Sequence, residues 1–462
     1  MRRFVFAGLF ACSFVSVATL VSLVTQAAAP SGVQLPGDEW PQWRGPRRDA
    51  ISTDTGLLQE WPEGGPKLAW KSSGLGGGFS SVAVTGGKIF TMGDILPPPP
   101  ADAPPVDPKA KKKGGGAPTG KQYVFALDGK DGRELWRTQI GQSFEQTGYF
   151  GPRCTPTVDG DRVYALGTDG ELLCLNAEDG KVVFSKNFKS DFGGRMMSGW
   201  SWSESPTIDG DKLVVTPGGP DAGIVALDKK TGKEIWRSKL ELTGDNGKDG
   251  AGYSSIVISN GAGRKQYVTI VGRGCVGVDA ETGKYLWGYN KVANPTANIP
   301  TPIVRDDYVF CTTGYPGGGA ALLKLVKDGD GVKADEVWYT KSQEFQNHHG
   351  GVILVGDYLY CGKGHNKGFP TCVEFLTGKS VWDGGRGPGS GSAAVTAADG
   401  QLYFRYQDGT MALIELSPAG YKLNGTFKIP DCENPSWQHP VVIGGKLYLR
   451  EQDNLFVYDV KK

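Results

Sequence analysis

The stretch LDKKTGKEIW, residues 227–236, decides the fold because it recurs along the chain. In each copy an acidic or amide side chain at the end of one strand folds onto the backbone ahead and starts a turn. The glycine takes the positive-φ position that closes a hairpin with a bulge. We expect the aromatic residue four positions later to pack between neighbouring sheets. The other copies are LDGKDGRELW (127–136), LNAEDGKVVF (175–184), VDAETGKYLW (278–287) and VEFLTGKSVW (373–382).

A second repeated pattern marks another hairpin in every unit. It consists of a hydrophobic residue, a polar or glycine turn, a basic or polar residue, and a β-branched residue beside an aromatic or aliphatic one. DG and GG between β-branched runs are strong hairpin signals. The pattern occurs at 84–90, 158–164, 208–214, 304–310, 354–360, 397–403 and 442–448, and with an insertion at 258–268.

The aromatic residues of the last strand in each unit give the repeat length. After a first interval that carries an insertion, they are spaced 44 to 52 residues apart. Four short strands, a to d, in a repeat of this length are the signature of a β-propeller blade. The eight positions are Trp70, Trp136, Phe184, Trp236, Trp287, Trp338, Trp382 and Phe427.

The two ends of the repeat region predict how the ring closes. NLFVYDV at 454–460 is a strand c without a strand d, and KLAWK at 67–71 is a strand d without a strand c. We therefore predict an all-β fold, an eight-bladed β-propeller of four-stranded antiparallel blades, closed by an N-terminal strand that completes the last blade. Such closure removes two open sheet edges.

The remaining segments are expected to lie outside this repeat. Residues 30–66, which include WPQWRGPRRD, have no periodicity and are expected to form an irregular lead-in laid over the propeller at 67–462. Residues 95–120 form a Pro-, Lys- and Gly-rich insertion that is expected to be disordered, because it cannot bury apolar area.

The N-terminus predicts export. Arg2 and Arg3 precede an apolar run at 4–24 and small residues at 27–29, which is typical of a signal peptide over residues 1–29. The expected location is the periplasm or cell envelope, with membrane association only if this segment stays uncleaved. The 50 basic and 49 acidic residues argue against a nucleic-acid partner. Cys361 and Cys372 lie on successive expected strands, and the sequence is compatible either with a disulfide between them or with two free thiols.

Candidate site residues concentrate on one face of the predicted ring. The a–b and c–d turns are short, whereas the d–a connections are long and several b–c connections are rich in glycine, and long loops on a rigid scaffold commonly carry function. The alternative is that these are ordinary polar residues beside a water-filled channel. His348 and His349 cannot both point inward if they are consecutive in a strand. The ligand-binding candidates are Tyr149, Arg153, Trp200, Trp202, Glu204, His348, His349, Trp437 and His439.

The repeat, with its GxVxALDxxTGKxxW-like core, resembles the quinoprotein-type propeller repeat. That repeat is known from pyrroloquinoline-quinone (PQQ) dehydrogenases and from the propeller lipoprotein of the bacterial outer-membrane assembly machine. The stretch WPQWRGPRRDAISTDTGLL also resembles the start of exported planctomycete-type PQQ-repeat proteins. The resemblance implies the propeller fold. The pair of adjacent cysteines found in many of the dehydrogenases is absent, and their calcium ligands have no motif-grade match here.

These observations favour an exported, non-catalytic propeller scaffold that binds an envelope protein or a small ligand at the d–a/b–c loop face. The alternative is a PQQ- and calcium-dependent dehydrogenase of alcohols or sugars. We assign no catalytic residue and no metal ligand, because no metal-binding, P-loop or nucleophile motif occurs. A carbohydrate-active propeller would rest only on Glu204 and on loop acids such as Asp191 and Asp221.

Overall fold

The repeated stretch forms a hairpin, as its turn residues require. At residues 227–236, β14 (Ile224–Asp228) pairs with β15 (Glu234–Ser238), and the register shifts by a bulge at the turn. The Asp228 carboxylate accepts hydrogen bonds from the backbone N–H and the hydroxyl of Thr231. Gly232 has a φ of 69°, in the left-handed region that favours glycine. Local chemistry therefore fixes the c–d turn of each blade.

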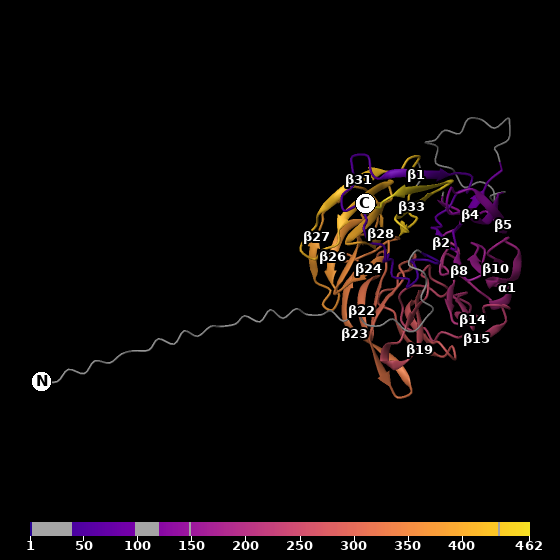
Figure 1. The fold of residues 1–462 in the computed structure, drawn as a ribbon. Helices are drawn as coiled ribbons and strands as arrows, with labels where there is room; N and C mark the ends of the chain where they lie inside the picture. The colour runs from indigo at the N-terminus through magenta and orange to yellow at the C-terminus, as the bar shows by residue number, and fades with distance from the viewer. Residues whose placement is uncertain (2–38, 98–119, 147–148, 433–434) are drawn as a thin grey trace. The chain divides into compact units, whose positions relative to one another are not determined.

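A computed structural model describes residue 1 and residues 39–97, 120–146, 149–432 and 435–462. These residues contain eight four-stranded antiparallel sheets within the unit that spans 36–462, and the sheets follow one another around a ring (Figure 1). The predicted eight-bladed propeller is confirmed. The predicted signal peptide and nearly all of the 95–120 insertion lie outside the described residues.

The first four blades take their strands in chain order, from a at the ring axis to d at the periphery. Their strands are β2 (Ala83–Thr85), β3 (Lys88–Ile95), β4 (Lys121–Asp128) and β5 (Glu134–Gln142); β8 (Thr157–Asp159), β9 (Arg162–Leu166), β10 (Glu171–Asn176) and β11 (Val182–Asn187); β12 (Thr207–Asp209), β13 (Lys212–Val215), β14 and β15; β16 (Val257–Ser259), β17 (Gln266–Val271), β18 (Gly274–Asp279) and β19 (Tyr285–Tyr289).

The last four blades follow the same order, except that the eighth takes its outer strand from the N-terminal part of the chain. Their strands are β20 (Ile303–Arg305), β21 (Tyr308–Thr312), β22 (Gly319–Asp328) and β23 (Gly331–Lys341); β24 (Val352–Val355), β25 (Tyr358–Lys363), β26 (Phe369–Glu374) and β27 (Ser380–Asp383); β28 (Ala393–Ala398), β29 (Gln401–Tyr406), β30 (Thr410–Glu415) and β31 (Leu423–Lys428); β32 (Val441–Ile443), β33 (Lys446–Glu451), β34 (Asn454–Asp459) and β1 (Lys67–Ser72).

Small elements occupy some of the connections between strands. A two-stranded sheet of β6 (Glu145–Gln146) and β7 (Tyr149–Phe150) and the helix α1 (Phe188–Phe192) lie in d–a connections. The 3₁₀ turn η1 (Gly261–Gly263) accounts for the expected insertion in the a–b hairpin of blade 4. In the part of the chain that the structure describes, no helix has the length and apolar character needed to span a bilayer.

Closure of the ring agrees with the prediction. β1 pairs antiparallel with β34, from Lys67 opposite Asp459 to Ser72 opposite Leu455. In Figure 1 the purple β1 lies beside the yellow strands of the last blade. The N-terminal strand therefore completes blade 8, and the ring is closed by hydrogen bonds between the two ends of the repeat region.

The repeated aromatic residues pack between blades, as expected. A Cβ placed on Gly232 would lie 2.6 Å from the ring of Phe184 in the preceding blade, so the turn glycine and the aromatic ring are in direct contact. The Trp136 indole also donates to the carbonyl of Ala177 in the next blade. The same glycine–aromatic contact joins Trp70 with Gly132, Trp136 with Gly180, Trp236 with Gly283 and Trp338 with Gly378.

The first part of the lead-in runs inside the ring, whereas its second part lies over the a–b turns of blades 7 and 8. Residues 39–52, here called the channel segment, run along the innermost strands: Trp40 bridges Val84 of β2, and Ile51 bridges Ala397 of β28. Beyond this segment, Asp54 accepts from the backbone of Gly444 and Gly445, and the Leu57 backbone N–H donates to Asp399. Arg44 and Arg48 are only 4% and 7% exposed. Buried guanidinium groups need hydrogen-bond acceptors, and the carbonyl-rich ends of the inner strands supply them.

Arg48 shows how the channel segment joins blades. Its guanidinium donates to the carbonyls of Ser205 and Ile256, each at 3.2 Å, to the carbonyl of Pro206, and to the Gln42 side chain at 3.0 Å. Ser205 and Pro206 precede β12 of blade 3, and Ile256 precedes β16 of blade 4. One side chain therefore ties two blades and the channel segment together.

The structure resolves the open question about two cysteines. Cys361 lies opposite Thr371, and Cys372 lies opposite Tyr360, in the β25–β26 ladder. Because successive side chains of a strand point to opposite faces, the two thiols cannot meet across this pair. Both are free and buried.

Candidate ligand-binding cavity

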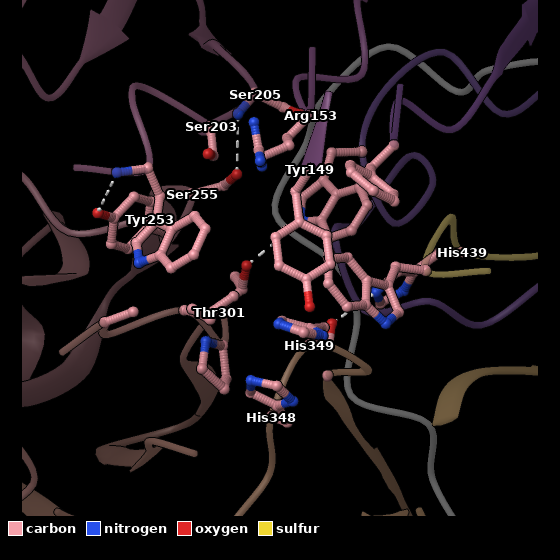
Figure 2. Close-up of a pocket in the computed structure, with 18 of the residues that line it drawn as sticks. Tyr149, Arg153, Ser203, Ser205, Tyr253, Ser255, Thr301, His348, His349 and His439 are labelled. Atoms are coloured by element: carbon pink, nitrogen blue, oxygen red, sulfur yellow. Dashed lines mark hydrogen bonds between the residues drawn. The ribbon is translucent and has the colours of Figure 1, made fainter. Parts of the chain in front are cut away.

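A cavity of about 340 Å³ lies where the d–a and b–c connections converge on the channel, and it is here called the mouth cavity (Figure 2). Its lining residues come from the loops entering blades 1 to 6 and 8, from b–c loops, and from the channel segment. A cavity of this size lined by aromatic and a few polar groups is typical of a small-molecule site. The loop face that the sequence singles out therefore contains a defined hollow.

Most of the predicted site residues meet in this cavity. His348 and His349 both line it because they precede β24 rather than belonging to a strand, so the expected alternation of side chains does not apply. The b–c loop residue His365 joins them. The predicted residues that line the mouth cavity are Tyr149, Arg153, Trp200, His348, His349, Trp437 and His439.

Trp202 and Glu204 lie in the surrounding wall and do not line the cavity. Trp202 packs edge-on against Phe188 at a centroid distance of 5.8 Å and donates its indole N–H to the carbonyl of Pro217. Glu204 accepts from the backbone N–H of Thr216, and burial raises the pKa of its carboxyl to about 7. Their placement points to structural contacts, those of Trp202 between blades 2 and 3 and those of Glu204 within blade 3.

Aromatic rings form one wall of the cavity. Trp437 lies 4.8 Å from Phe79 and 4.9 Å from Tyr149, each with an interplanar angle of 33°. His349 lies 4.3 Å from the same indole, and Trp200 lies 5.8 Å from Tyr149. Figure 2 shows Tyr149 above His349. These rings come from blades distant in sequence, so the closed ring assembles the wall.

Two histidines of the cavity, His348 and His439, are held neutral. His348 hydrogen-bonds through Nδ1 to Ser392 at 2.7 Å and through Nε2 to Tyr315 at 2.9 Å. Burial lowers the pKa of His348 to about 3, helped by the nearby His365. Burial likewise lowers the pKa of His439 to about 3, and His439 Nε2 donates to the carbonyl of His349. At neutral pH these imidazoles act as polar, uncharged groups.

The floor of the cavity comes from the channel segment, whose residues are not among the candidates predicted from the sequence. The Trp43 indole donates to Thr301 Oγ1 at 3.2 Å and lies edge-on to His439, with centroids 4.5 Å apart. Arg44 donates to backbone carbonyls of Arg48, Asp49 and Val352. One sequence feature could have indicated this role: Trp and Arg residues are concentrated in this aperiodic stretch, although the chain as a whole is nearly neutral.

A second guanidinium group, that of Arg153, lies in the cavity wall. It stacks against Phe79 at 5.5 Å and Phe144 at 5.4 Å, and its Nη1 donates to the carbonyl of Gly151. Burial lowers its pKa to about 10, so it remains charged at neutral pH. Asp94 is near enough to act on Arg153 electrostatically, and burial raises the pKa of Asp94 to about 6.

Comparison with known proteins places the chain in a family. The family model described as outer membrane protein assembly factor BamB matches residues 120–384, more than half of the chain. The chain belongs to the BamB family. This membership confirms the resemblance to the outer-membrane assembly propeller, and it supports a scaffold or assembly role at the level of the family.

Relatives of this BamB-family protein include both assembly factors and dehydrogenases. It is 31% identical over 128 residues to the quinoprotein ethanol dehydrogenase of Pseudomonas putida, covering 24% of this chain and 19% of the relative. It is 22% identical over 196 residues to BamB of Burkholderia pseudomallei, covering 42% of this chain and 44% of the relative. The chain therefore spans less than half the length of each of these two curated relatives.

A solved structure shares the fold. The structure of a europium-containing methanol dehydrogenase superimposes with a TM-score of 0.59 at 12% identity, covering 90% of this chain and 89% of that chain. At this identity the likeness shows the propeller architecture alone.

The quinoprotein relatives raise the question whether the mouth cavity fits PQQ with calcium. Calcium takes six to eight oxygen ligands, among which carboxylates are prominent. The residues that line the cavity include neither Asp nor Glu. Over the described ranges, no group of three or more His, Cys, Asp or Glu is arranged to hold a metal ion. The donors at the cavity therefore do not fit a calcium-bound quinone, and we derive no step through one.

Proposed function

We propose that this protein is an exported, non-catalytic propeller scaffold that holds a small ligand in the mouth cavity. The observation that carries the proposal is the lining: aromatic rings, imidazoles, hydroxyl groups and two guanidinium groups surround about 340 Å³. Export is supported by the signal-like pattern of residues 1–29. A scaffold role is supported by BamB-family membership.

The non-catalytic part of the proposal rests on the proton chemistry of the lining. General acid–base catalysis works best when the pKa of the group lies near the working pH. The buried imidazoles of His348 and His439 have pKa values of about 3, so they are weak proton acceptors at neutral pH. His348 also has both ring nitrogens engaged. These groups are suited to holding a ligand rather than to activating one.

Two other functions are candidates on specific grounds. Family membership favours a protein partner at the cell envelope, which would dock on the loops around the mouth cavity. The dehydrogenase relatives favour oxidation of an alcohol or sugar by bound PQQ, but that chemistry commonly needs a metal as Lewis acid and a nearby base. The lining offers no carboxylate for either role.

The test is a fluorescence titration of the purified full chain with ring-containing small molecules, and with PQQ in the presence and absence of Ca²⁺. Saturable quenching is expected for at least one ring compound, weakened about tenfold by Trp437→Phe, because Trp437 is part of the cavity wall. The matched control Trp70→Phe changes an indole on the outer strand β1 and should leave the affinity unaltered.

Two results would overturn the proposal. Calcium-dependent PQQ binding coupled to dye reduction by an alcohol or sugar would replace the scaffold by a dehydrogenase. Absence of quenching by every compound at tens of micromolar would remove the small ligand and leave the protein partner as the function to pursue.

A further inference from the structure

We infer that the mouth cavity is a carboxylate-binding site, so that its ligand is a small organic acid carrying a ring. This inference rests on the proposed function, because it names the class of ligand that the same cavity would hold. It is carried by hydrogen-bond donors that border the cavity without an acidic partner there, and by the aromatic rings opposite them.

Arg153 is the main anion-binding group. Its single hydrogen bond to a described residue goes to the carbonyl of Gly151, which leaves further N–H groups of the guanidinium unused at the cavity. Asp94 does not neutralise it by contact, since the Asp94 oxygens accept from the Gln122 amide and the Phe144 backbone N–H. Asp94 is also absent from the cavity lining. A guanidinium in this setting is best satisfied by an oxyanion.

Arg44 adds a second guanidinium at the floor. Arg44 is 4% exposed, and its Nη1 has no hydrogen-bond partner among the described residues. This nitrogen lies against Gly351, where an added Cβ would be 2.4 Å away, and Gly351 lines the mouth cavity. A buried, unpaired guanidinium nitrogen is costly. A ligand acceptor reaching the floor beside Gly351 would relieve that cost.

Two hydroxyl groups extend the donor set. Ser255 Oγ accepts from the backbone N–H of Ser205 at 2.9 Å, and Thr301 Oγ1 accepts from the Trp43 indole at 3.2 Å. Both residues line the cavity, and neither hydroxyl donates to another described group. Because each oxygen already accepts one bond, its own hydrogen is available to a ligand oxygen.

The charge of the cavity favours a carboxylate over a neutral compound and over a dianion. Two arginines border it, no Asp or Glu lines it, and His348 and His439 stay uncharged at neutral pH because burial lowers their pKa values. A phosphate presents more oxygens than these few donors satisfy, whereas a carboxylate matches one guanidinium fork and one or two hydroxyls. The wall of Trp437, Tyr149 and Trp200 suits a ring as the body of the ligand.

The experiment compares three probes of nearly equal shape, namely benzoate, benzamide and benzyl alcohol, by calorimetry on the full chain at pH 7.5. We expect benzoate to bind at least tenfold more tightly than either neutral probe, and inorganic phosphate more weakly than benzoate. Arg153→Gln should reduce the preference for benzoate to below about threefold while leaving benzamide binding unaltered. Arg153→Lys, which keeps the charge and loses the fork, should retain an intermediate preference.

The matched control is Arg195→Gln. Arg195 is half-exposed, pairs with Asp249 and lies outside the cavity lining, so its loss should leave the benzoate preference intact. Equal affinities for the three probes, or a preference that survives Arg153→Gln, would overturn the carboxylate site while leaving a small-ligand cavity in place. Failure of all three probes together with the wider panel of ring compounds would overturn the proposed function as well.

Discussion

The repeated c–d turns and the channel segment both join blades, but they do so by opposite means. A turn such as that around Gly232 obeys a local rule, and its contact with Phe184 recurs with other pairs around the ring. The channel segment has no repeat, and Arg48 makes its contacts to blades 3 and 4 once. Many repeated contacts thus specify the ring, whereas a single stretch of sequence, the channel segment, forms the floor of its cavity.

This difference predicts where substitutions will hurt most. Loss of one repeated contact leaves equivalent contacts elsewhere in the ring, whereas loss of a contact of the channel segment has no substitute. Substitutions in the channel segment are therefore expected to cost more stability than substitutions at a repeated turn.

The largest effect is expected for Arg48→Met. The substitution keeps an unbranched side chain but removes three hydrogen bonds from a charged donor to buried carbonyls. The carbonyls of Pro206 and Ile256 keep the hydroxyls of Thr157 and Thr207 as donors, whereas the Ser205 carbonyl loses the Arg48 bond without such a replacement among the described residues. Breaking such a buried charged network costs about 3–5 kcal/mol of unfolding free energy. Denaturant unfolding followed by tryptophan fluorescence measures it.

The matched control is Arg47→Met, one residue earlier. Arg47 is exposed and pairs with Asp49 at the surface, so its loss should change the unfolding free energy by less than about 0.5 kcal/mol. Similar losses for the two variants would mean that the channel segment is stabilised by its general packing rather than by the Arg48 network.

A smaller effect is expected at a repeated turn. Gly232 and Gly210 have φ values of 69° and 60°, but an added Cβ meets the Phe184 ring at Gly232 and nothing within 4 Å at Gly210. Gly210→Ala should therefore cost about 1 kcal/mol from backbone strain alone. Gly232→Ala should cost about 2–4 kcal/mol, because overpacking against the ring is added.

The difference between the two glycine variants measures the contact between blades. Equal melting temperatures for Gly232→Ala and Gly210→Ala would show that the aromatic–glycine contact contributes nothing beyond the turn itself. That outcome would contradict the proposal that the repeated turns join neighbouring blades through their glycine–aromatic contacts.

The fold was predictable because its signals are redundant and local. Turn chemistry at Asp228 and Gly232, repeated at a near-constant spacing, specifies four strands per blade, and the unpaired strand 67–71 specifies closure. Where one copy of the repeat is atypical, the other copies still indicate its strands and turns. The η1 insertion in blade 4 shows this, since the loosest copy still forms its hairpin.

The cavity was predictable only in part, for a physical reason. The loop positions of Tyr149, His348 and Trp437 follow from the blade order, so their convergence could be expected. The floor could not, because Arg44 and Arg48 adopt φ values of 62° and 56°, a conformation that nothing in an arginine predicts. Their burial depends on carbonyls supplied by distant inner strands, which no local pattern reports.

An effect at the lower end of that expected for Gly232→Ala concerns pH and the unrepeated loop that carries His348. Its folded pKa is lowered to about 3, chiefly by burial, against an unfolded value of about 6.5. As the pH falls from 7.5 to 5, the unfolded chain takes up a proton at this residue and the folded chain does not. Stability should therefore be full above pH 6.5 and fall by about 2 kcal/mol at pH 5 through this one group.

Comparison with His348→Gln isolates that contribution. Buried acids such as Glu204, whose folded pKa is raised to about 7, act in the opposite direction over the same range but equally in both proteins. The variant should lack the loss of unfolding free energy that His348 causes at low pH, so its deficit relative to the wild type should shrink as the pH falls. Parallel pH curves for the two proteins would mean that His348 takes up a proton in the folded state as readily as in the unfolded chain. That result would contradict a rigid loop, in which the buried hydrogen bonds to Ser392 and Tyr315 hold the imidazole neutral.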